Sequence, residues 1–356
     1  MTSLKLDVKF HHMTNKNLTR RNFLKLAGIS LSSLAFNPML ENKFKPMQRR
    51  LMRVAKIAKD GEKTSVSIHQ EPDEESTILY QRYKDELVNV YGEIESETGP
   101  EYNPVWYRVW GGYVHRAYLQ EVDYSLNRVV DSIKEGRQLG EVTVPYTNSL
   151  LFSTLTGWEP VYRLYYQTTH WVTDIITGPD GEAWYQLEDE LDRLNYAIPA
   201  KHMRILDDSE FTPISSDVPP GEKRIEISIS RQELTAYEGD RVVLNTNIAS
   251  GALTSQKQTP VGEFRIQSTY PSKHMGGTKR DDIDAYVLPG VPWSCFFTEG
   301  IATHGTYWHN NYGTPQSSGC VNMRNHEAKW LFRWVTPVGE SHDVYKTGFG
   351  TRVTVL

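Results

Sequence analysis

The chain has 356 residues, of which 38% are hydrophobic and 23% charged, and its formal net charge is −5. This length suits two or three domains of ordinary size, and no stretch approaches the roughly 20 apolar residues of a membrane-spanning helix. The charge is uneven, because residues 1–59 hold 13 Lys/Arg and 2 Asp/Glu, a net +11, which leaves −16 for the remainder. Such an acidic body excludes nucleic acid as a partner.

The segment TRRNFLKLAGISLSSLAF, at 19–36, places two arginines before Phe23, Leu24 and a weakly apolar run. It resembles the twin-arginine signal that sends folded proteins across the bacterial cytoplasmic membrane. Residues 1–40 are therefore expected to be an export signal that places the protein in the cell wall or periplasm, and membrane contact is expected only through this segment. An amphipathic helix or a simple anchor is the alternative. Residues 41–60 are expected to form a basic tether.

Short β-like segments separated by turns begin at Gly61, and 20 Tyr and 9 Trp favour β-rich folds. The stretch WYRVWGGYVHRAYL resembles the small SH3-like barrels attached to bacterial cell-wall enzymes, which predicts such a domain at 61–122. A weak repeat, Trp184-Tyr185 after Trp106-Tyr107, predicts a second and weaker SH3-like region at 123–211. The alternative is that both regions are spacers without a ligand.

A linker rich in Pro, Ser and Asp is expected at 212–224, followed by a mainly β domain at 225–356. ELTAYEGDRVVLNTNIA predicts a hairpin that turns at Glu238-Gly239-Asp240. The run at 325–334 predicts a helix, because apolar side chains recur at the spacing of one buried face; they are Ala328, Leu331, Phe332 and Val335.

The chain has two cysteines, and they differ in setting. Cys320 lies in a Ser-Ser-Gly-Cys turn sixteen residues after His304, so it is a candidate nucleophile whose proton the histidine would accept. Cys295 lies in an apolar strand-like run and is expected to be a small buried hydrophobe. A Cys295–Cys320 disulfide stays open as an alternative. A zinc site of His304, His309, Cys320 and His326 is a further alternative, but its spacing fits no compact zinc motif, so no metal and no cofactor are expected.

Residues 222–356 resemble the catalytic domain of the L,D-transpeptidases, the cysteine enzymes that remodel peptidoglycan. The resemblance rests on QTPVGEFRI, GIATHGTYW, SSGCVNM and the helix and last strand, which occur in the family's order over some 135 residues. It implies a β-sandwich catalytic domain with one helix near the nucleophile, preceded by the SH3-like barrels.

The resemblance also implies roles for particular residues. Cys320 would be the nucleophile, His304 its base, and Gly305 would orient the histidine through its carbonyl. The oxyanion hole would be formed by backbone amides of Ser318, Gly319 and Cys320. Tyr307, Trp308 and Asn322 are expected to contact substrate, although the aromatic residues, Tyr312 included, are equally consistent with core packing.

The implied reaction is 3→3 cross-linking of peptidoglycan stem peptides through a Cys320 acyl-enzyme, and carbapenem-type inhibitors are expected to bind. One departure stands out: Ser318 occupies a position where the family usually has histidine. His274, His309 or His326 would have to replace that imidazole. The alternatives are an L,D-carboxypeptidase or a wall-binding scaffold with a silent catalytic domain.

Overall fold

The computed structural model describes residues 45–55, 65–254, 257–277 and 287–356. Over these ranges the chain forms four β-sheets and a single α-helix, α2 (Asn325–Trp334), so the predicted mainly β fold is confirmed. The predicted signal, residues 1–40, lies outside the described residues. None of the helices in these ranges combines the length and apolar character that a bilayer span requires.

The first sheet has seven strands in the order β3-β2-β6-β5-β4-β1-β7. A 3-10 turn, η1 (Arg116–Tyr118), separates its last two strands in the chain. Its strands are β1 (Lys45–Val54), β2 (Ser65–His69), β3 (Ile78–Tyr83), β4 (Leu87–Glu95), β5 (Val105–Val109), β6 (Gly112–His115) and β7 (Leu119–Val122).

Strand β1 corrects the prediction of a basic tether at 41–60. Residues 45–54 pair with both β4 and β7, and Met52 and Val54 are fully buried in the core of this sheet. The prediction was based on the positive charges of this segment. In the structure Arg50 is exposed, whereas Arg53 is buried and paired with Asp85. The unit therefore starts before the predicted boundary at residue 61.

The second sheet also has seven strands, in the order β10-β9-β13-β12-β11-β8-β14. Its strands are β8 (Gln138–Val142), β9 (Tyr146–Ser153), β10 (Gly157–Tyr165), β11 (Thr169–Thr177), β12 (Ala183–Glu188), β13 (Asn195–Pro199) and β14 (Met203–Ile205). Two 3-10 turns accompany them, η2 (Lys134–Gly136) before β8 and η3 (Ala200–His202) before β14.

The two seven-stranded sheets repeat one topology. Adding seven to each strand number of the first sheet gives the order of the second, and η1 and η3 occupy the same place in each. Trp106-Tyr107 on β5 and Trp184-Tyr185 on β12 correspond, and all four side chains are buried. The weak sequence repeat is therefore a repeat of structure, while the resemblance of either unit to SH3-like barrels stays a prediction.

The C-terminal part holds two five-stranded sheets. One has the order β17-β16-β15-β24-β18, with strands β15 (Lys223–Ser228), β16 (Glu233–Glu238), β17 (Arg241–Asn247), β18 (Gly262–Arg265) and β24 (Arg352–Val355). The other has the order β22-β21-β20-β19-β23, with strands β19 (Ser268–Gly276), β20 (Val287–Thr298), β21 (Ile301–Gly305), β22 (Val321–Met323) and β23 (Lys346–Thr347).

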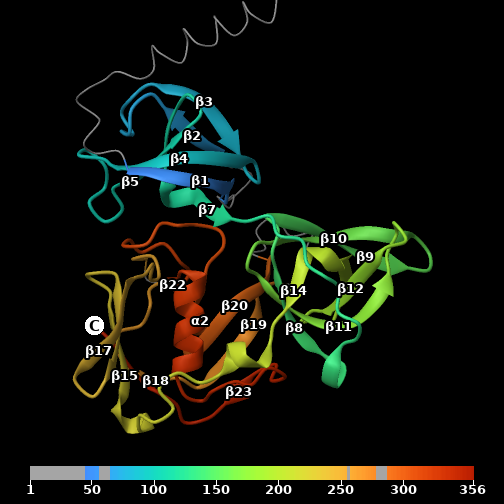
Figure 1. Ribbon diagram of the computed structural model, residues 1–356. Coiled ribbons are helices and arrows are strands. Elements are labelled where there is room, and N and C mark those ends of the chain that lie inside the picture. The colour runs from blue at the N-terminus through green and yellow to red at the C-terminus, as the bar shows by residue number, and fades with distance from the viewer. Residues whose placement is uncertain (1–44, 56–64, 255–256, 278–286) are drawn as a thin grey trace, which may run out of the picture. The chain divides into compact units, whose positions relative to one another are not determined.

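Helix α2 lies between these two sheets (Figure 1). Its buried face is the predicted one, formed by Ala328, Leu331 and Phe332 with Val335 just beyond its end. One core joins this face to Ile225 and Val353 of the first five-stranded sheet and to Trp293 and Phe297 of the second. The predicted hairpin is confirmed as β16 and β17, with Gly239 at a φ of +58° in the turn.

Only part of the expected linker at 212–224 lies outside secondary structure. The 3-10 turn η4 (Asp208–Phe211) directly precedes it, a second one, η5 (Pro220–Glu222), lies within it, and β15 already begins at Lys223. The buried Lys223 ammonium donates to the carbonyls of Ile214 and Trp334 at 2.9 and 3.0 Å. These bonds fasten the segment to the end of α2.

The second seven-stranded sheet contacts β19 through several polar pairs, and Leu139 and Trp171 of the same sheet belong to the core that contains Trp293. Lys273 pairs with Glu190 at 2.8 Å, and the buried His274 ring is 2.7 Å from Asp189. The hydroxyl of Thr169 donates to the carbonyl of Pro271 at 2.7 Å. Because these groups are mostly buried, separating the two parts would leave several polar atoms without partners.

We expect Arg53→Met to destabilise the protein by about 1–3 kcal/mol, because it leaves Gln120 Oε1 and the Tyr307 carbonyl without their buried donor, while Asp85 keeps its pair with Arg163. Urea unfolding measures the shift. The matched control on the same strand is Arg50→Met, since Arg50 is 42% exposed and its pairs with Glu93 and Glu121 are superficial; the control should change stability by at most about 1 kcal/mol. Equal effects of the two substitutions would contradict a structural role for the buried charge.

Candidate active site

The candidate residues meet where β21 and β22 run side by side. The strands are parallel, with Thr303 opposite Val321 and His304 opposite Asn322. Cys320 directly precedes β22, so the fold brings it to the strand that carries His304. Residues 306–320 form the loop and turn between these two strands.

His304 is held in one tautomer. Its ring is buried, with 2% exposure, and Nδ1 lies 2.9 Å from the Gly305 carbonyl oxygen. A carbonyl can only accept, so Nδ1 carries the proton and Nε2 keeps a lone pair. Burial lowers the His304 pKa to about 4, against a smaller opposing effect of the Gly305 bond. The ring is therefore neutral at pH 7 and has one nitrogen free to accept a proton.

Gly305 fits its place because there is no room for a side chain. A Cβ there would lie 2.5 Å from Asn325 Oδ1 and 2.9 Å from Pro292 Cγ. Both atoms belong to neighbouring buried elements, so a larger residue would move the carbonyl that anchors His304. The orientation predicted for His304 thus depends on this glycine.

Cys320 is partly exposed, and its thiol donates to the Gly300 carbonyl at 3.6 Å. The Cys320–His304 hydrogen bond implied by the resemblance is therefore not formed in this structure. Hydrogen bonds between a nucleophile and its base are often absent until substrate binds. Burial raises the pKa of the Cys320 thiol, and a hydrogen bond with the Ala302 backbone opposes this, so the resting group is the neutral thiol.

The turn before Cys320 depends on Gly319. Its φ is +121°, and a Cβ would meet Ile301 Cδ1 at 2.6 Å. Thr259 donates to the Gly319 carbonyl at 2.7 Å, and Ser317 Oγ accepts from the Gly319 amide at 3.1 Å and donates to the Cys320 carbonyl. The Gly319 amide, predicted to line an oxyanion hole, is thus already occupied. The amides of Ser318 and Cys320 donate to no residue in the described ranges.

The aromatic residues expected to contact substrate are packed inside the protein. Tyr307 is 2% exposed and stacks on Tyr165 of β10, with centroids 5.4 Å apart. Trp308 lies edge-on to Tyr307 and 5.8 Å from the His304 ring, and the Tyr312 hydroxyl donates to the Met323 carbonyl. Core packing, the second of the two predicted readings, is therefore the structural role of these side chains.

Asn322 takes part in a buried pair that the sequence did not single out. The His309 Nδ1 accepts from the Asn311 amide at 3.1 Å, so Nε2 is the protonated nitrogen, and it lies 2.9 Å from the Asn322 side-chain amide. A flip of the Asn322 amide would let its Oδ1, which otherwise has no partner, accept the hydrogen bond from His309 Nε2. Burial, together with repulsion from His304, lowers the His309 pKa to about 3.

Ser318, next in sequence to Gly319, is exposed. Of the three histidines expected to replace the family's imidazole, His274 pairs with Asp189 of the second sheet, and His326 is exposed on α2. Of the three, only His309 is close enough to the site for His304 to lower its pKa electrostatically.

Cys295 is a free, fully buried thiol in the core of β20, as predicted, and Cys320 is free as well, so the alternative disulfide is not formed. Burial raises the pKa of Cys295 to about 12. Within the described ranges, no three His, Cys, Asp or Glu residues are grouped closely enough to hold a metal ion.

This C-terminal part matches a known family. The YkuD family model, described as the L,D-transpeptidase catalytic domain, covers residues 222–355. Residues 222–355 are similar to the L,D-transpeptidase catalytic domain. The boundary agrees with the start of β15 at Lys223 and with the last strand, β24.

Individual relatives agree with this assignment of the L,D-transpeptidase domain. A Bacillus licheniformis protein named L,D-transpeptidase YkuD is 32% identical over 104 residues, which are 29% of this chain and 54% of that protein. The chain thus spans about half the length of this curated relative.

Solved structures similar to this chain include two L,D-transpeptidases. The catalytic domain from E. faecium is 24% identical, covering 38% of this chain and 98% of that one, with a TM-score of 0.29. The enzyme from Xylanimonas cellulosilytica is 27% identical, covering 41% and 63%, with a TM-score of 0.27.

We expect Gly319→Ala to lower stability by about 1–3 kcal/mol, because alanine is strained at this φ and its Cβ has no space. It should also change the rate at which Ellman's reagent labels Cys320. The matched control is Gly239→Ala, which also has a positive φ, +58°, but nothing within 4 Å; its cost should be about 1 kcal/mol, with unchanged labelling. An unchanged labelling rate in both variants would contradict the role given to Gly319.

Proposed function

We propose that this chain is an exported L,D-transpeptidase that forms 3→3 peptidoglycan cross-links through an acyl-enzyme on Cys320. The observation that carries the proposal is the pairing of β21 with β22, which brings the partly exposed Cys320 next to the strand that carries His304, a buried and neutral histidine whose tautomer is fixed. This is the nucleophile–base–orienter arrangement, with the Gly305 carbonyl as the third member. The family of residues 222–355 supports the same chemistry.

In the first half-reaction, Cys320 Sγ attacks the carbonyl carbon of the third residue of a stem tetrapeptide. The thiol proton passes to His304 Nε2, since Nδ1 is occupied by the Gly305 carbonyl. Sγ must turn away from the Gly300 carbonyl for this transfer. The C–N bond to the terminal D-Ala then breaks, and His304 returns the proton to the departing amine.

The negative oxygen of the tetrahedral intermediate needs backbone donors. With the Gly319 amide bound to Ser317, the amides of Ser318 and Cys320 are the available donors. Preorganised backbone donors of this kind contribute strongly to acyl transfer, because they need no rearrangement when charge develops. The exposed Ser318 side chain leaves this approach open to a peptide.

In the second half-reaction, an amine of a neighbouring stem attacks the thioester. His304 takes the proton from that amine and gives it to the leaving sulfur, which restores the thiol. The product is the 3→3 link, and water in place of the amine would give hydrolysis. A carbapenem would acylate the same sulfur by the first half-reaction alone.

Export of the chain is part of this proposal, since its substrate lies outside the cytoplasm. It is supported by Arg20-Arg21 and the weakly apolar run that follows them. The seven-stranded sheets would hold the enzyme near the wall.

We expect Cys320→Ala to abolish acylation, because it removes the nucleophile while leaving the core intact. Intact-protein mass spectrometry after incubation with a tetrapeptide stem or a carbapenem measures the adduct, one per wild-type chain. The matched control is Cys295→Ala, which should keep acylation since Cys295 lies in the core. An adduct on Cys320→Ala would refute the assignment, and no adduct on the wild type would favour the scaffold reading.

The His304 pKa predicts an unusual pH profile. Because burial lowers this pKa to about 4, the base is already neutral at pH 5, so carbapenem acylation should vary little between about pH 5 and 7 and fall only near pH 4. It should rise again in the alkaline range, where the thiol with its raised pKa ionises. Stopped-flow measurement of the acylation rate checks this, and half-maximal acylation near pH 6.5 would contradict it.

A further inference from the structure

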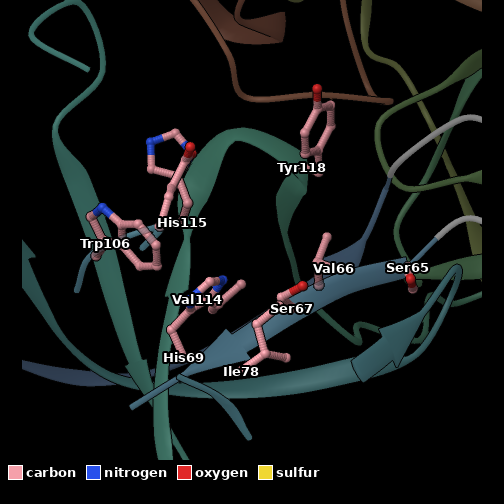
Figure 2. Close-up of a pocket in the computed structure, with 10 residues that line it drawn as sticks. Ser65, Val66, Ser67, His69, Ile78, Trp106, Val114, His115 and Tyr118 are labelled. Atoms are coloured by element: carbon pink, nitrogen blue, oxygen red, sulfur yellow. The ribbon is translucent and has the colours of Figure 1, made fainter. Parts of the chain in front are cut away.

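A cavity of about 330 Å³ opens on the first seven-stranded sheet, away from Cys320 in sequence and outside the site described above (Figure 2). Side chains reach it from β2, β3, β5, β6, η1 and the loop between β2 and β3. They are Ser65, Val66, Ser67, His69, Glu74, Ile78, Trp106, Val114, His115 and Tyr118. Its volume lies at the lower end of the range for sites that take small ligands.

The wall of the cavity is a tryptophan with a histidine on either side. Trp106 is fully buried, and its ring centroid lies 5.4 Å from those of both His69 and His115, each in an edge-on arrangement. The ladder between β5 and β6 fixes this order, because Trp106 is opposite His115. Strand pairing therefore holds both imidazoles against the same indole ring.

In each histidine one ring nitrogen forms a hydrogen bond to a backbone carbonyl and the other does not. His69 Nδ1 donates to the Ser76 carbonyl at 3.2 Å, and His115 Nε2 donates to the Asn103 carbonyl at 2.7 Å. Both bonds require the proton on the nitrogen named, so the other nitrogen carries a lone pair in the neutral ring. Burial lowers the His115 pKa, which favours that neutral ring. Neither remaining nitrogen bonds to a described residue.

Glu74 adds a negative charge at the rim. Its carboxylate is exposed and forms no ion pair within the described ranges, yet it is close enough to affect the pKa of both His115 and Tyr118. The other sheet carboxylates near basic groups are already paired, as Glu93 and Glu121 are with Arg50. The cavity thus presents acceptors, a negative charge and aromatic faces, with Val66 and Val114 as an apolar lining.

We propose that this cavity binds a primary ammonium group at the end of an aliphatic side chain, as a lysine-like diamino acid in a peptide carries. An ammonium has three N–H donors for the acceptors of His69, His115 and Glu74, and aromatic rings attract a cation. The methylene groups of the stem would contact Val66 and Val114. A free anion would meet Glu74 and no described cation in the cavity lining. We identify this peptide as the acceptor stem, bound through the amine of its third residue. This identification rests on the proposed function.

The test is an equilibrium titration, by NMR or calorimetry, of the full chain bearing Cys320→Ala. The probe is N-acetyl-lysine N-methylamide, and the matched probe is the norleucine analogue, which has the same length without the ammonium. We expect saturable binding of the lysine probe and at least about tenfold weaker binding of the norleucine probe. Equal binding of the two probes, or no saturable binding of either, would overturn the proposal.

A pair of variants tests whether the probe binds in this cavity. Glu74→Gln should weaken lysine binding about fivefold, because it removes the only charge on the cavity lining. The control, Glu71→Gln, changes an exposed carboxylate of the same loop that does not line the cavity, and should leave binding unchanged. Equal loss in both variants, or in neither, would overturn the assignment to this cavity.

The titration needs no catalysis, so the two proposals can fail separately. Intact lysine binding without carbapenem acylation of the wild type would contradict the enzyme function and leave the cavity assignment standing. Acylation of Cys320 without lysine binding would contradict the cavity assignment alone.

Discussion

The guanidinium of Arg53 joins the three β-rich parts of the chain at one point. Arg53 is 1% exposed, lies on β1 of the first sheet and pairs with Asp85 at 3.0 Å. It also lies over the Tyr165 ring of the second sheet, 4.1 Å from its centroid, and donates to the Tyr307 carbonyl of the catalytic domain at 2.7 Å. A buried charge of this kind is tolerated only when its partners are complete, so the three parts must stay together to satisfy it.

The loop after Gly305 is the part of the catalytic domain that this contact reaches. Asn103 of the first unit donates to Asn311 at 3.0 Å, and Asn325 donates to Gln167 of the second unit at 3.1 Å. Residues next to His304 are thus fixed by the preceding units, which limits movement of the ring and its carbonyl anchor. Precise orientation of a base usually needs support of this kind from surrounding residues. The preceding sheets therefore complete the surroundings of the catalytic residues.

The two seven-stranded units share a topology but not a surface. In the second unit the Trp184 indole donates to Asp180 at 2.8 Å and lies 6.0 Å from Trp158. In the first unit Trp106 has no partner for its indole nitrogen and lies between two histidines beside the cavity. The two units therefore share a topology but differ in the side chains at equivalent positions. A function found in one unit cannot be transferred to the other.

Features controlled by local chemistry could be predicted from the sequence alone. The period of apolar residues gave α2, the Glu238-Gly239-Asp240 turn gave the hairpin, and the motifs around Cys320 identified the family of residues 222–355. The relation of His304 to the Gly305 carbonyl was implied by the family resemblance, and the structure contains this contact.

Contacts between residues far apart in the sequence became known only from the tertiary structure. The basic run at 45–54 became a strand because β4 and β7 offered it hydrogen bonds and Asp85 offered Arg53 a counter-charge. Tyr307 became a buried contact because Tyr165, far away in sequence, lies against it. Sequence patterns report which side chains are apolar or charged, but burial depends on groups brought together by folding, and those pairings are not encoded in any one segment.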